Sequence, residues 1–322
     1  MIISFTINVQ IATNLFNAIK PFEIVQILKI LHSYRYQNVL ATETQPEKIL
    51  WWQQCNFRSN GNQLNFSPLV GNTPTTSNII STREFIYCLI FMNLPEKILF
   101  VIDTAREQNC TPFKLTKGAS YMPLFMIKRV IENFICIKSV IQNSHEYALM
   151  TLNSNGVQWN CDFTNRTDTI IDHLDLLNED IIEDEQDSYD FGPVFNTIQE
   201  KVPVPIEEIH DTIRPTFIVR IILIYARSNS IPIFETGKEF LDAVREKYFY
   251  IDVLYVHEPP SLENASEEIH SKMTALDIKN DSYILETGRN AARLHENMAK
   301  LLGHPLLRPH QRDACYTIPD IL

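Results

Sequence analysis

Glycine is scarce in this chain, which has only eight among its 322 residues. Neither of the glycine-rich phosphate loops, G-x-G-x-x-G and G-x-x-x-x-G-K-[ST], is present. Those loops need glycine where the backbone approaches a phosphate group. After the apolar run at 98–102, no glycine occurs before Gly118. These absences exclude the usual dinucleotide and nucleotide sites.

Signatures of hydrolytic enzymes are absent as well. The sequence has no G-x-S-x-G elbow, no H-E-x-x-H pair and no H-x-H among its nine histidines. His257 and His295 each stand alone, and a lone histidine is more often structural than catalytic. We therefore predict that the protein is not an enzyme and has no catalytic residue, no metal ligand and no cofactor. An unrecognised site that uses Asp103 or His257 stays a hypothesis without a supporting constellation.

Basic surface charge, paired cysteines and long apolar runs are also lacking. The net charge is −11 and the lysines and arginines are scattered, whereas nucleic-acid binding needs a basic face. None of the six cysteines forms a C-x-x-C, so we expect reduced, buried cysteines in a protein of the cytoplasm or nucleus. The apolar run at 85–92 has eight residues, whereas a bilayer-spanning helix needs about 20. We predict no direct nucleic-acid partner and no membrane association.

Residues 1–93 carry no clear pattern. The segment 57–78 is polar and rich in glycine, proline, asparagine and threonine, which predicts a disordered loop. The pentapeptide "PEKIL" occurs at 46–50 and again at 95–99, as a gene-model error could produce. We predict that 1–93 is a poorly ordered N-terminal region or is mis-annotated.

From residue 94 onward, strand and helix patterns alternate. "KILFVID", at 97–103, is a continuous apolar strand of the kind that is buried on both faces of a parallel sheet. "HEYALMTLN" and "GVQWNCDF" predict a hairpin joined through "NSNG". The spacing predicts a long helix at 119–142, whose apolar stripe is Ile127, Val130, Phe134, Ile137 and Ile141. Further strands are expected at 216–226, 248–257 and 281–287, and further helices at 166–178, 190–201, 237–247 and 288–302.

This order predicts an α/β domain over 94–303. Its sheet is doubly wound and mostly parallel, with one antiparallel edge strand. Ligands of such sheets bind at the carboxyl ends of the strands, where Asp103 ends the first strand. Asp103 is therefore the first residue to test for a site.

A metal site at Asp103 would need oxygen ligands in the loop that follows. A strand that ends in Asp-x-Ser-x-Ser before a long helix is typical of the magnesium site of von Willebrand factor A domains. Here Ala105 and Glu107 stand at the two serine positions, and "YARSNS" places Arg227 near the mouth, where a cation repels a metal ion. We predict that Asp103 braces its loop through hydrogen bonds. The alternative is a metal-dependent domain that binds an acidic ligand through Asp103, Thr104 and Glu107.

An acidic stretch follows the hairpin. Between Thr167 and Glu200 the chain has no lysine or arginine, and nine acidic residues lie within 172–190. Such a run is either a solvated loop and helix face or a patch that meets a basic partner. The role of 168–190 stays open between these two interpretations.

The C-terminal tail, 304–322, is a candidate docking element. Pro305 and Pro309 bracket two leucines and Arg308. Proline favours an extended backbone that loses little entropy on docking, and Arg308 could pair with a partner's carboxylate. The alternative is a tail that packs back on its own domain. The predicted partner-binding residues are His304, Pro305, Leu306, Arg308 and Pro309.

Four stretches carry a family resemblance: "PEKILFVID", "SHEYALMTLN", "YFYIDVLYVH" and "LHENMAKLLGHPLLRP". They resemble the von Willebrand A-like scaffold subunit shared by the BRISC complex and the related breast-cancer-susceptibility A complex, over roughly 94–318. The resemblance implies a von Willebrand A-like fold with a degenerate metal site, in agreement with Ala105. It also implies a non-catalytic subunit that assembles and stabilises a zinc isopeptidase for lysine-63-linked ubiquitin chains.

The same resemblance implies partners and places of action. The direct partner is a subunit built from ubiquitin-E2-variant domains, contacted through Pro305 and Arg308; the zinc isopeptidase and its scaffold partner are further members of the complex. Members act in the nucleus in DNA damage repair and checkpoint control, and in the cytoplasm in mitosis and cytokine signalling. The family's polar, acidic N-terminal lead does not match 1–93. Neither the relevant complex nor the stoichiometry follows from the resemblance.

Overall fold

The computed structural model describes two strands at 55–60 and 63–68 and most of the chain from Leu94 to Ala314. Within that span it describes residues 94–115, 118–154, 156–182, 186–203, 205, 215–235, 240 and 248–314. Contacts between Cα atoms divide the chain into two units, one of which is Phe91–Leu306. The other unit combines Met1–Ile90 with Leu307–Leu322. The predicted boundaries at 93 and 303 stay predictions.

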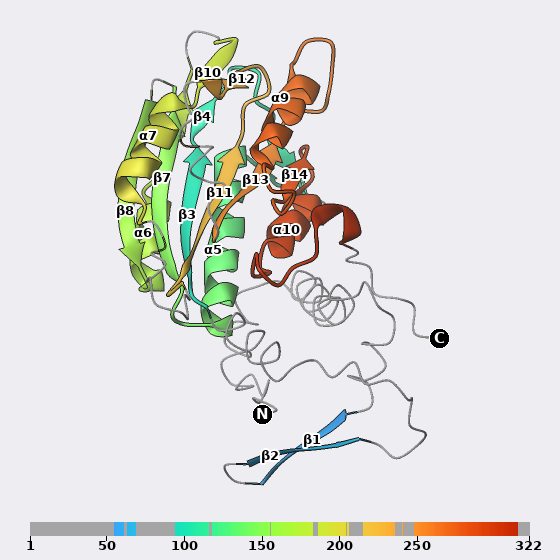
Figure 1. Ribbon diagram of the computed structural model, residues 1–322. Coiled ribbons are helices and arrows are strands. Elements are labelled where there is room, and N and C mark those ends of the chain that lie inside the picture. Colours follow the sequence, from blue (N-terminus) through green and yellow to red (C-terminus); the bar gives the residue numbers. More distant parts are fainter. Residues whose placement is uncertain are drawn as a thin grey trace. The chain divides into compact units, whose positions relative to one another are not determined.

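A six-stranded sheet forms the centre of the unit Phe91–Leu306 (Figure 1). The strand order is β14-β13-β11-β3-β7-β8. All neighbours are parallel except β7 and β8, which form the predicted antiparallel hairpin at one edge. The prediction of a doubly wound, mostly parallel sheet is confirmed. The strands are β3 (Glu96–Asp103), β7 (Glu146–Asn153), β8 (Gly156–Thr164), β11 (Ile218–Tyr225), β13 (Phe249–Val256) and β14 (Ile284–Thr287).

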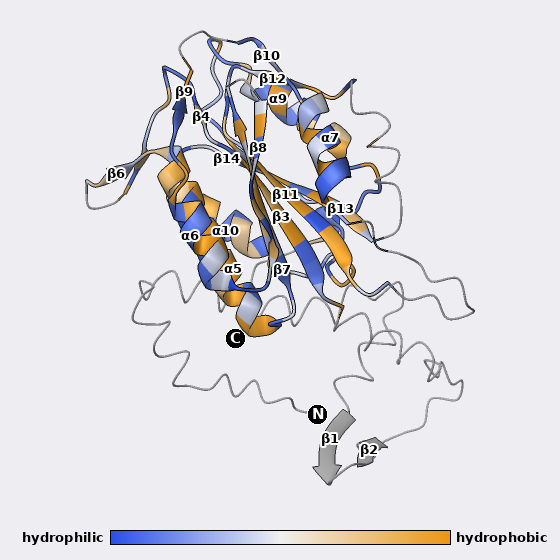
Figure 2. Ribbon diagram, turned by 90° about the vertical axis from the view of Figure 1, so that its left-hand side faces the viewer, coloured by the Kyte–Doolittle hydropathy of each residue, from blue (hydrophilic) through white to orange (hydrophobic). Residues whose placement is uncertain are grey.

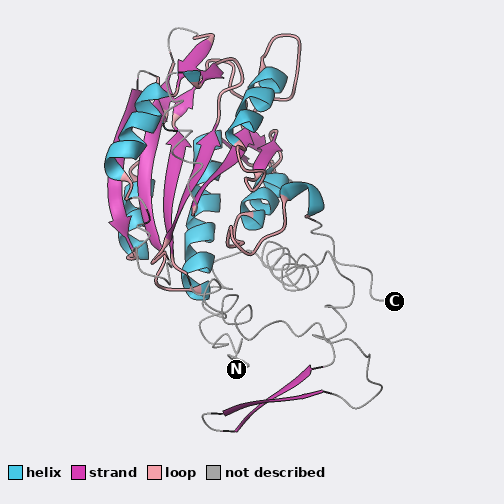
Figure 3. Cartoon of the chain, viewed as in Figure 1, coloured by secondary structure: helices cyan, strands magenta, loops and turns pink. Residues whose placement is uncertain are grey.

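Helices cover both faces of this sheet (Figures 2 and 3). α5 (Pro123–Ile141) contacts both α6 (Thr167–Asp175) and α10 (Ala291–Lys300) on one face. α7 (Gly192–Lys201) and α9 (Ser266–Met273) pack on the other face, against one continuous apolar cluster. Because both faces are covered, every residue of β11 and β13 is buried. The continuous apolar sequence of these strands follows from that double burial.

The face under α5 shows how the sequence selects a side of the sheet. Alternate residues of a strand point to opposite faces, so Leu99 and Val101 join the cluster under α7 and α9. Phe100 lies on the opposite face and meets Phe134 of α5 edge to face, with ring centroids 5.6 Å apart. Burial of such side chains contributes about 25 cal/mol per Å² of apolar area. This term drives the assembly of helix on sheet.

The apolar stripe predicted for α5 is wrong at its last turns. Ile127, Val130 and Phe134 are buried as predicted, but Ile141 is 48% exposed. Lys138 points inward in its place and is 2% exposed. The helix therefore buries the ammonium group of Lys138 against the end of the sheet, because the carboxylate of Glu96 and the carbonyl of Leu302 lie there as its partners.

Several smaller elements were not predicted. The strands β1 (Cys55–Asn60) and β2 (Gln63–Pro68) pair antiparallel, so the prediction of a loop at 57–78 is wrong for these residues. The intervening Gly61–Asn62 is a pair that favours turns. Of the helix predicted at 237–247 the structure describes Phe240 alone, which is helical, and the other residues of the prediction lie outside the described ranges. The other short elements are β4 (Ala105–Arg106), β5 (Phe113–Lys114), β6 (Ser120–Tyr121), β9 (Asp180–Ile181), β10 (Ser188–Asp190), β12 (Ile231–Ile233), η2 (Thr274–Leu276) and η3 (Gln311–Asp313).

Candidate functional site

The reversal of winding places one crevice at the carboxyl ends of β3 and β11. These strands are neighbours, and the chain winds outward from them in both directions, to β7 and β8 on one side and to β13 and β14 on the other. In open α/β sheets this switch point is where ligands bind. Asp103 ends β3, and Ala226 and Arg227 directly follow β11.

Asp103 and Arg227 form a buried ion pair in this crevice. Asp103 is 1% exposed and Arg227 is fully buried. Arg227 Nε lies 3.2 and 3.1 Å from the two carboxylate oxygens of Asp103, and Nη2 lies 3.1 Å from Oδ1. The backbone N–H groups of Ala105 and Ala226 donate to the same carboxylate, each at 3.2 Å. Four donors therefore surround one aspartate, as the hydrogen-bonding role predicted for Asp103 requires.

The guanidinium of Arg227 has further partners beyond Asp103. Its Nη2 donates to the carbonyl of Asn153 at 2.9 Å. Its carbon atom lies 4.1 Å from the ring centroid of Tyr189, which is a cation–π distance. The arginine thus bridges the loops after β3, β7 and β11.

The other two candidate metal ligands are engaged as well. The hydroxyl of Thr104 donates to the carbonyl of Leu152 at 2.8 Å. The carboxylate of Glu107 accepts from the backbone N–H groups of Ser228 and Asn229, both at 2.8 Å. Burial raises the pKa of Glu107, although these two hydrogen bonds oppose the rise. Both side chains hold the loops together.

The residues of this crevice do not fit a magnesium ion. Magnesium needs hard oxygen ligands in octahedral geometry, and Ala105 offers no side-chain oxygen. The guanidinium of Arg227 lies against the carboxylate of Asp103, where it fills the space of a bound divalent ion and would repel that ion. Among the residues that the structure describes, no group of three or more His, Cys, Asp or Glu side chains is placed to hold a metal.

His257, the other residue considered for catalysis, lies at the end of β13. It is 6% exposed. Its Nδ1 donates to the carbonyl of Glu258 at 2.6 Å, and its ring stacks on Tyr255 with centroids 4.8 Å apart. These contacts give the ring a packing role, and the structure brings His257 and Asp103 into no shared hydrogen bond within the described ranges.

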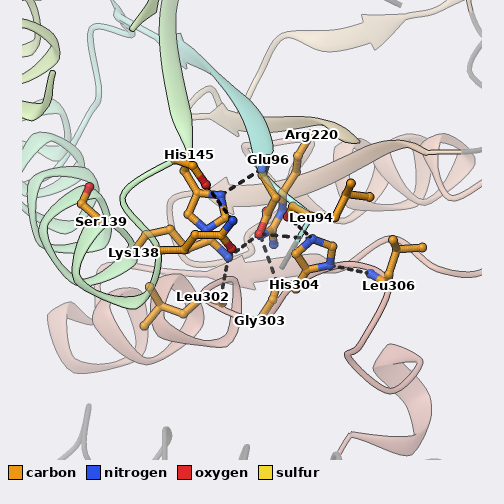
Figure 4. Close-up of polar contacts among 12 residues, drawn as sticks. Leu94, Glu96, Lys138, Ser139, His145, Arg220, Leu302, Gly303, His304 and Leu306 are labelled. Carbon is orange, nitrogen blue, oxygen red and sulfur yellow. Dashed lines mark hydrogen bonds and ion pairs between the residues drawn. The ribbon is translucent and has the colours of Figure 1, made fainter. Parts of the chain in front are cut away.

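A second buried network lies at the opposite, amino end of the same sheet (Figure 4). Glu96, at the start of β3, is fully buried. Lys138 Nζ lies 2.5 Å from its Oε1, and Arg220 Nη1 lies 3.2 Å from its Oε2. Arg220 also binds Asp252 Oδ2 through Nε and Nη2, both at 2.7 Å. The second oxygen of Asp252 accepts from the backbone N–H of Tyr283 at 2.7 Å.

This network, which we call the basal network (Glu96, Lys138, Arg220 and Asp252), holds the chain that leaves α10. Lys138 Nζ donates to the carbonyl of Leu302 at 2.9 Å, and Arg220 Nη1 donates to the carbonyl of Gly303 at 3.1 Å. Two buried cations thus bind two consecutive carbonyls just before the tail.

Two histidines complete the surroundings of Glu96. The Nδ1 atom of His145 accepts from the backbone N–H of Glu96 at 2.9 Å. His304 donates from Nε2 to the carbonyl of Leu94 at 3.1 Å, and its Nδ1 accepts from the N–H of Leu306 at 3.3 Å. Both rings are therefore neutral in this arrangement, because each uses a nitrogen as acceptor.

The pKa values of these groups follow from their burial. Burial lowers the pKa of His145 and of His304 to about 4, although the Glu96 carboxylate opposes the change. Burial by itself would raise the pKa of Glu96, but the charges of Lys138 and Arg220 among others hold it far below its usual value. Glu96 is therefore ionised and the two histidines are neutral at pH 7.

The structure places the five residues of the predicted docking tail in different surroundings. His304 has 9% of its side chain exposed, and Pro305 is buried. Leu306 is partly buried and packs with Leu94, Ile218 and Tyr250. For His304 and Leu306 the alternative interpretation, a tail that packs on its own domain, describes the observed contacts. Arg308 is 8% exposed and Pro309 is partly buried.

Sequence reasoning missed the basal network, although a signal was present. Arg220 and Asp252 interrupt two of the most apolar strands, and Lys138 lies in the most apolar helix. A charge inside an apolar run that is buried on all sides needs an opposite charge. Pairing these interruptions by sign would have indicated the network.

The doubly wound sheet, its single antiparallel edge strand and its closed crevice define a von Willebrand factor A-like domain with a degenerate metal site. The chain belongs to the BRISC and BRCA1-A complex member 1 family. It is 32% identical to the "BRISC and BRCA1-A complex member 1" of Xenopus laevis over 254 residues, which are 78% of this chain and 76% of that protein. The Homo sapiens protein of the same name is 31% identical over 232 residues, which are 70% of this chain and 69% of that protein.

Comparisons with family models and with solved structures add little to this membership. No family model matches the chain. The solved VWA domain of SpRpn10 is 11% identical with a TM-score of 0.41, over 65% of this chain and 95% of that domain. Within the described ranges, no helix has both the length and the apolar character that crossing a membrane requires.

Proposed function

We propose that this chain is a non-catalytic scaffold subunit of a lysine-63-specific deubiquitinase complex, either BRISC, the BRCA1-A complex or both. Family membership supports this assignment, because the relatives carry the names of these complexes. The single observation in the structure that carries it is the Asp103–Arg227 pair. Because a guanidinium fills the crevice where such folds bind ligands, the domain is left with its outer surfaces and its tail for binding.

In this proposal the tail contacts a subunit built from ubiquitin-E2-variant domains. Arg308 supplies a charge-assisted bond to a carboxylate, and Pro305 and Pro309 keep the backbone extended. Arg308 is 8% exposed in the isolated chain, so docking through its guanidinium requires this side chain to leave its buried position. The basal network would then keep 302–303 in place while the residues beyond move.

The proposed setting follows from the complexes. The zinc isopeptidase and its scaffold partner are the other members that this chain would stabilise. DNA damage repair in the nucleus and mitosis in the cytoplasm are the processes in which we propose that it acts.

Arg308→Ala tests the tail. We expect the full-length variant to bind the purified E2-variant subunit about tenfold more weakly in calorimetry, because one charge-assisted bond of about 1.5–3 kcal/mol is lost. The matched control is Arg312→Ala, since Arg312 lies four residues further on with 81% of its side chain exposed. Equal affinity of Arg308→Ala and the wild type would remove Arg308 from the interface. Failure of the wild type to bind at all would refute the scaffold proposal.

A further inference from the structure

A cavity of about 630 Å³ lies between α6 and the β7–β8 hairpin. It adjoins the Asp103–Arg227 crevice, with which it shares Thr104 and Asn153, and its described lining includes no residue of the basal network or of the tail. Its wall includes residues between His173 and Asp180, which belong to the acidic stretch 168–190 whose role the sequence left open. The polar residues that matter most are Asn153, Gln158, Asn160, His173, Asn178 and Asp180.

The cavity exists because one face of the hairpin changes from apolar to polar. On β7, Tyr147 and Leu149 are fully buried, and the next residues on the same face are Thr151 and Asn153. Gln158 of β8 lies opposite Thr151 in the ladder. α6 ends at Asp175 and is only nine residues long. A polar strip that no helix covers remains open beside it.

Several hydrogen-bonding groups of this strip have spare capacity. Asp180 uses Oδ2 to accept from the N–H of Ser154 at 2.5 Å, and among the described residues its second oxygen accepts no hydrogen bond. His173 donates from Nδ1 to the carbonyl of Thr169 at 2.9 Å, which leaves Nε2 as an acceptor in the neutral ring. The carboxamides of Asn153 and Gln158 bind no other side chain within the described ranges. The unused acceptors are the second oxygen of Asp180, Nε2 of His173 and the oxygens of these two carboxamides, whose NH2 groups are unused donors.

The charge of the cavity is negative. Among the described residues that line it, Asp180 is the only one with a carboxyl group, and none is a lysine or arginine. Three cations lie nearby among the described residues, and each is engaged: Arg227 pairs with Asp103 and donates to the carbonyl of Asn153 at 2.9 Å. Arg106 pairs with Glu179 at 2.9 Å, and Lys128 donates to the carbonyls of Asp175 and Leu177 at 2.8 and 3.0 Å.

The cavity also opens onto the edge of the sheet. β8 is the last strand in the sheet order, and Gln158, which lines the cavity, is exposed. An extended peptide that pairs with an edge strand alternates its side chains between the two faces. Every second side chain of such a peptide would therefore lie on the α6 face, next to Gln158 and Asn160.

We propose that this cavity receives an arginine side chain from an extended segment of a basic partner protein, with Asp180 as the counter-ion. A guanidinium has five N–H donors and no acceptor, which matches the unused acceptors of Asp180, His173 and the carboxamides. The site assigns a role to one part of the acidic stretch and is independent of the proposed docking through the tail.

The test uses the full-length chain and a defined probe. The probe is a fluorescein-labelled, capped heptapeptide of alternating threonine and arginine, measured by fluorescence anisotropy at physiological salt. The matched probe carries citrulline, which keeps the shape of arginine and removes the charge. We expect the arginine peptide to bind at least about tenfold more tightly than the citrulline peptide.

Two variants and a control locate the binding. Asp180→Asn keeps an oxygen for the N–H of Ser154 and should weaken binding about tenfold. Gln158→Lys changes an exposed side chain, so it leaves the core intact, and its cation should abolish binding. The control is Asp172→Asn, which removes the same charge from an exposed position of α6 that does not line the cavity; we expect less than about a twofold effect, because exposed charges are screened. Equal losses in Asp180→Asn and Asp172→Asn, or no difference between the two peptides, would overturn the proposal.

Discussion

The two ends of the central sheet both bury charge, and they use it differently. At the carboxyl end, Asp103 and Arg227 bind each other and the backbone of the surrounding loops, and the guanidinium occupies the crevice. At the amino end, Lys138 and Arg220 bind Glu96 and also two main-chain carbonyls of the segment that leads to the tail. The end where this type of sheet usually binds ligands has become structural, and the opposite end holds the segment that we propose to extend toward a partner.

The physical cost of the two arrangements is similar in kind. A buried ion pair gains Coulomb energy but loses the hydration of both ions, so the pair as a whole adds little stability. Removing one partner is different, because it leaves an uncompensated charge in the interior. The loss of stability caused by a single substitution therefore reports how many buried charges the substituted residue had compensated.

The largest effect is expected for Arg220→Met. This substitution removes one cation from Glu96 and the Arg220 guanidinium from Asp252, and it removes the bond to the carbonyl of Gly303. We expect the free energy of unfolding, measured in urea, to fall by about 3–5 kcal/mol.

Arg129→Met is the matched control for Arg220→Met. Arg129 has 48% of its side chain exposed and pairs with Glu132 at the surface, so its loss should cost less than about 1 kcal/mol. If the two substitutions cost the same, the basal network does not bear on stability. If Arg220→Met fails to fold, Glu96→Gln tests the same network more mildly, because glutamine has the size of glutamate and lacks its charge.

Arg227→Met should destabilise the protein less than Arg220→Met does. Asp103 loses its only cation partner in the described part of the chain, but it keeps the two N–H bonds from Ala105 and Ala226. We expect a loss of about 2–3 kcal/mol in the same urea measurement. A loss larger than that of Arg220→Met would reverse the comparison between the two ends.

The third prediction is that stability depends on pH through two histidines at the amino end of the sheet. The ordinary pKa of histidine, 6.5, is lowered to about 4 in His145 and His304. Between about pH 6.5 and about pH 4, the two histidines are protonated in the unfolded chain and neutral in the folded protein. The free energy of unfolding should therefore fall as the pH decreases from about 6.5 to about 4.

The slope can be measured by thermal unfolding or urea unfolding across this pH range. Each histidine contributes at most about 1.4 kcal/mol per pH unit. His304→Gln should flatten the slope, since one of the two groups is gone. An unchanged slope in that variant would mean that His304 is accessible to protons in the folded protein.

The smallest expected effect is that of magnesium on the wild type. Because Arg227 lies against Asp103, millimolar magnesium should leave the melting temperature unchanged. A rise that calcium does not reproduce would return ion binding to the carboxyl end and would support the alternative function considered for Asp103, Thr104 and Glu107.

The predicted elements and the predicted site differed in how well the sequence specified them. The strands around "KILFVID" and "TFIVRIILIYA" were predicted because double burial leaves a continuous apolar run. The last turns of α5 were mispredicted, because helical spacing favours Ile141 over Lys138 unless the partners of the lysine are known. Arg227 was expected near Asp103 since both follow strands that end at the same edge.

Sequence alone determined the order of strands and helices, the mostly parallel sheet and the loss of a metal ligand at Ala105, because each depends on local spacing or on one residue's chemistry. Only the tertiary structure decided that Arg227 pairs with Asp103, that Glu96 joins Lys138 and Arg220, and that the hairpin leaves a cavity beside α6. Contacts of this kind join residues that lie tens to more than a hundred positions apart, as Glu96 and Arg220 do. Whether two such charges meet depends on how neighbouring strands align, and that alignment is a property of the packed sheet.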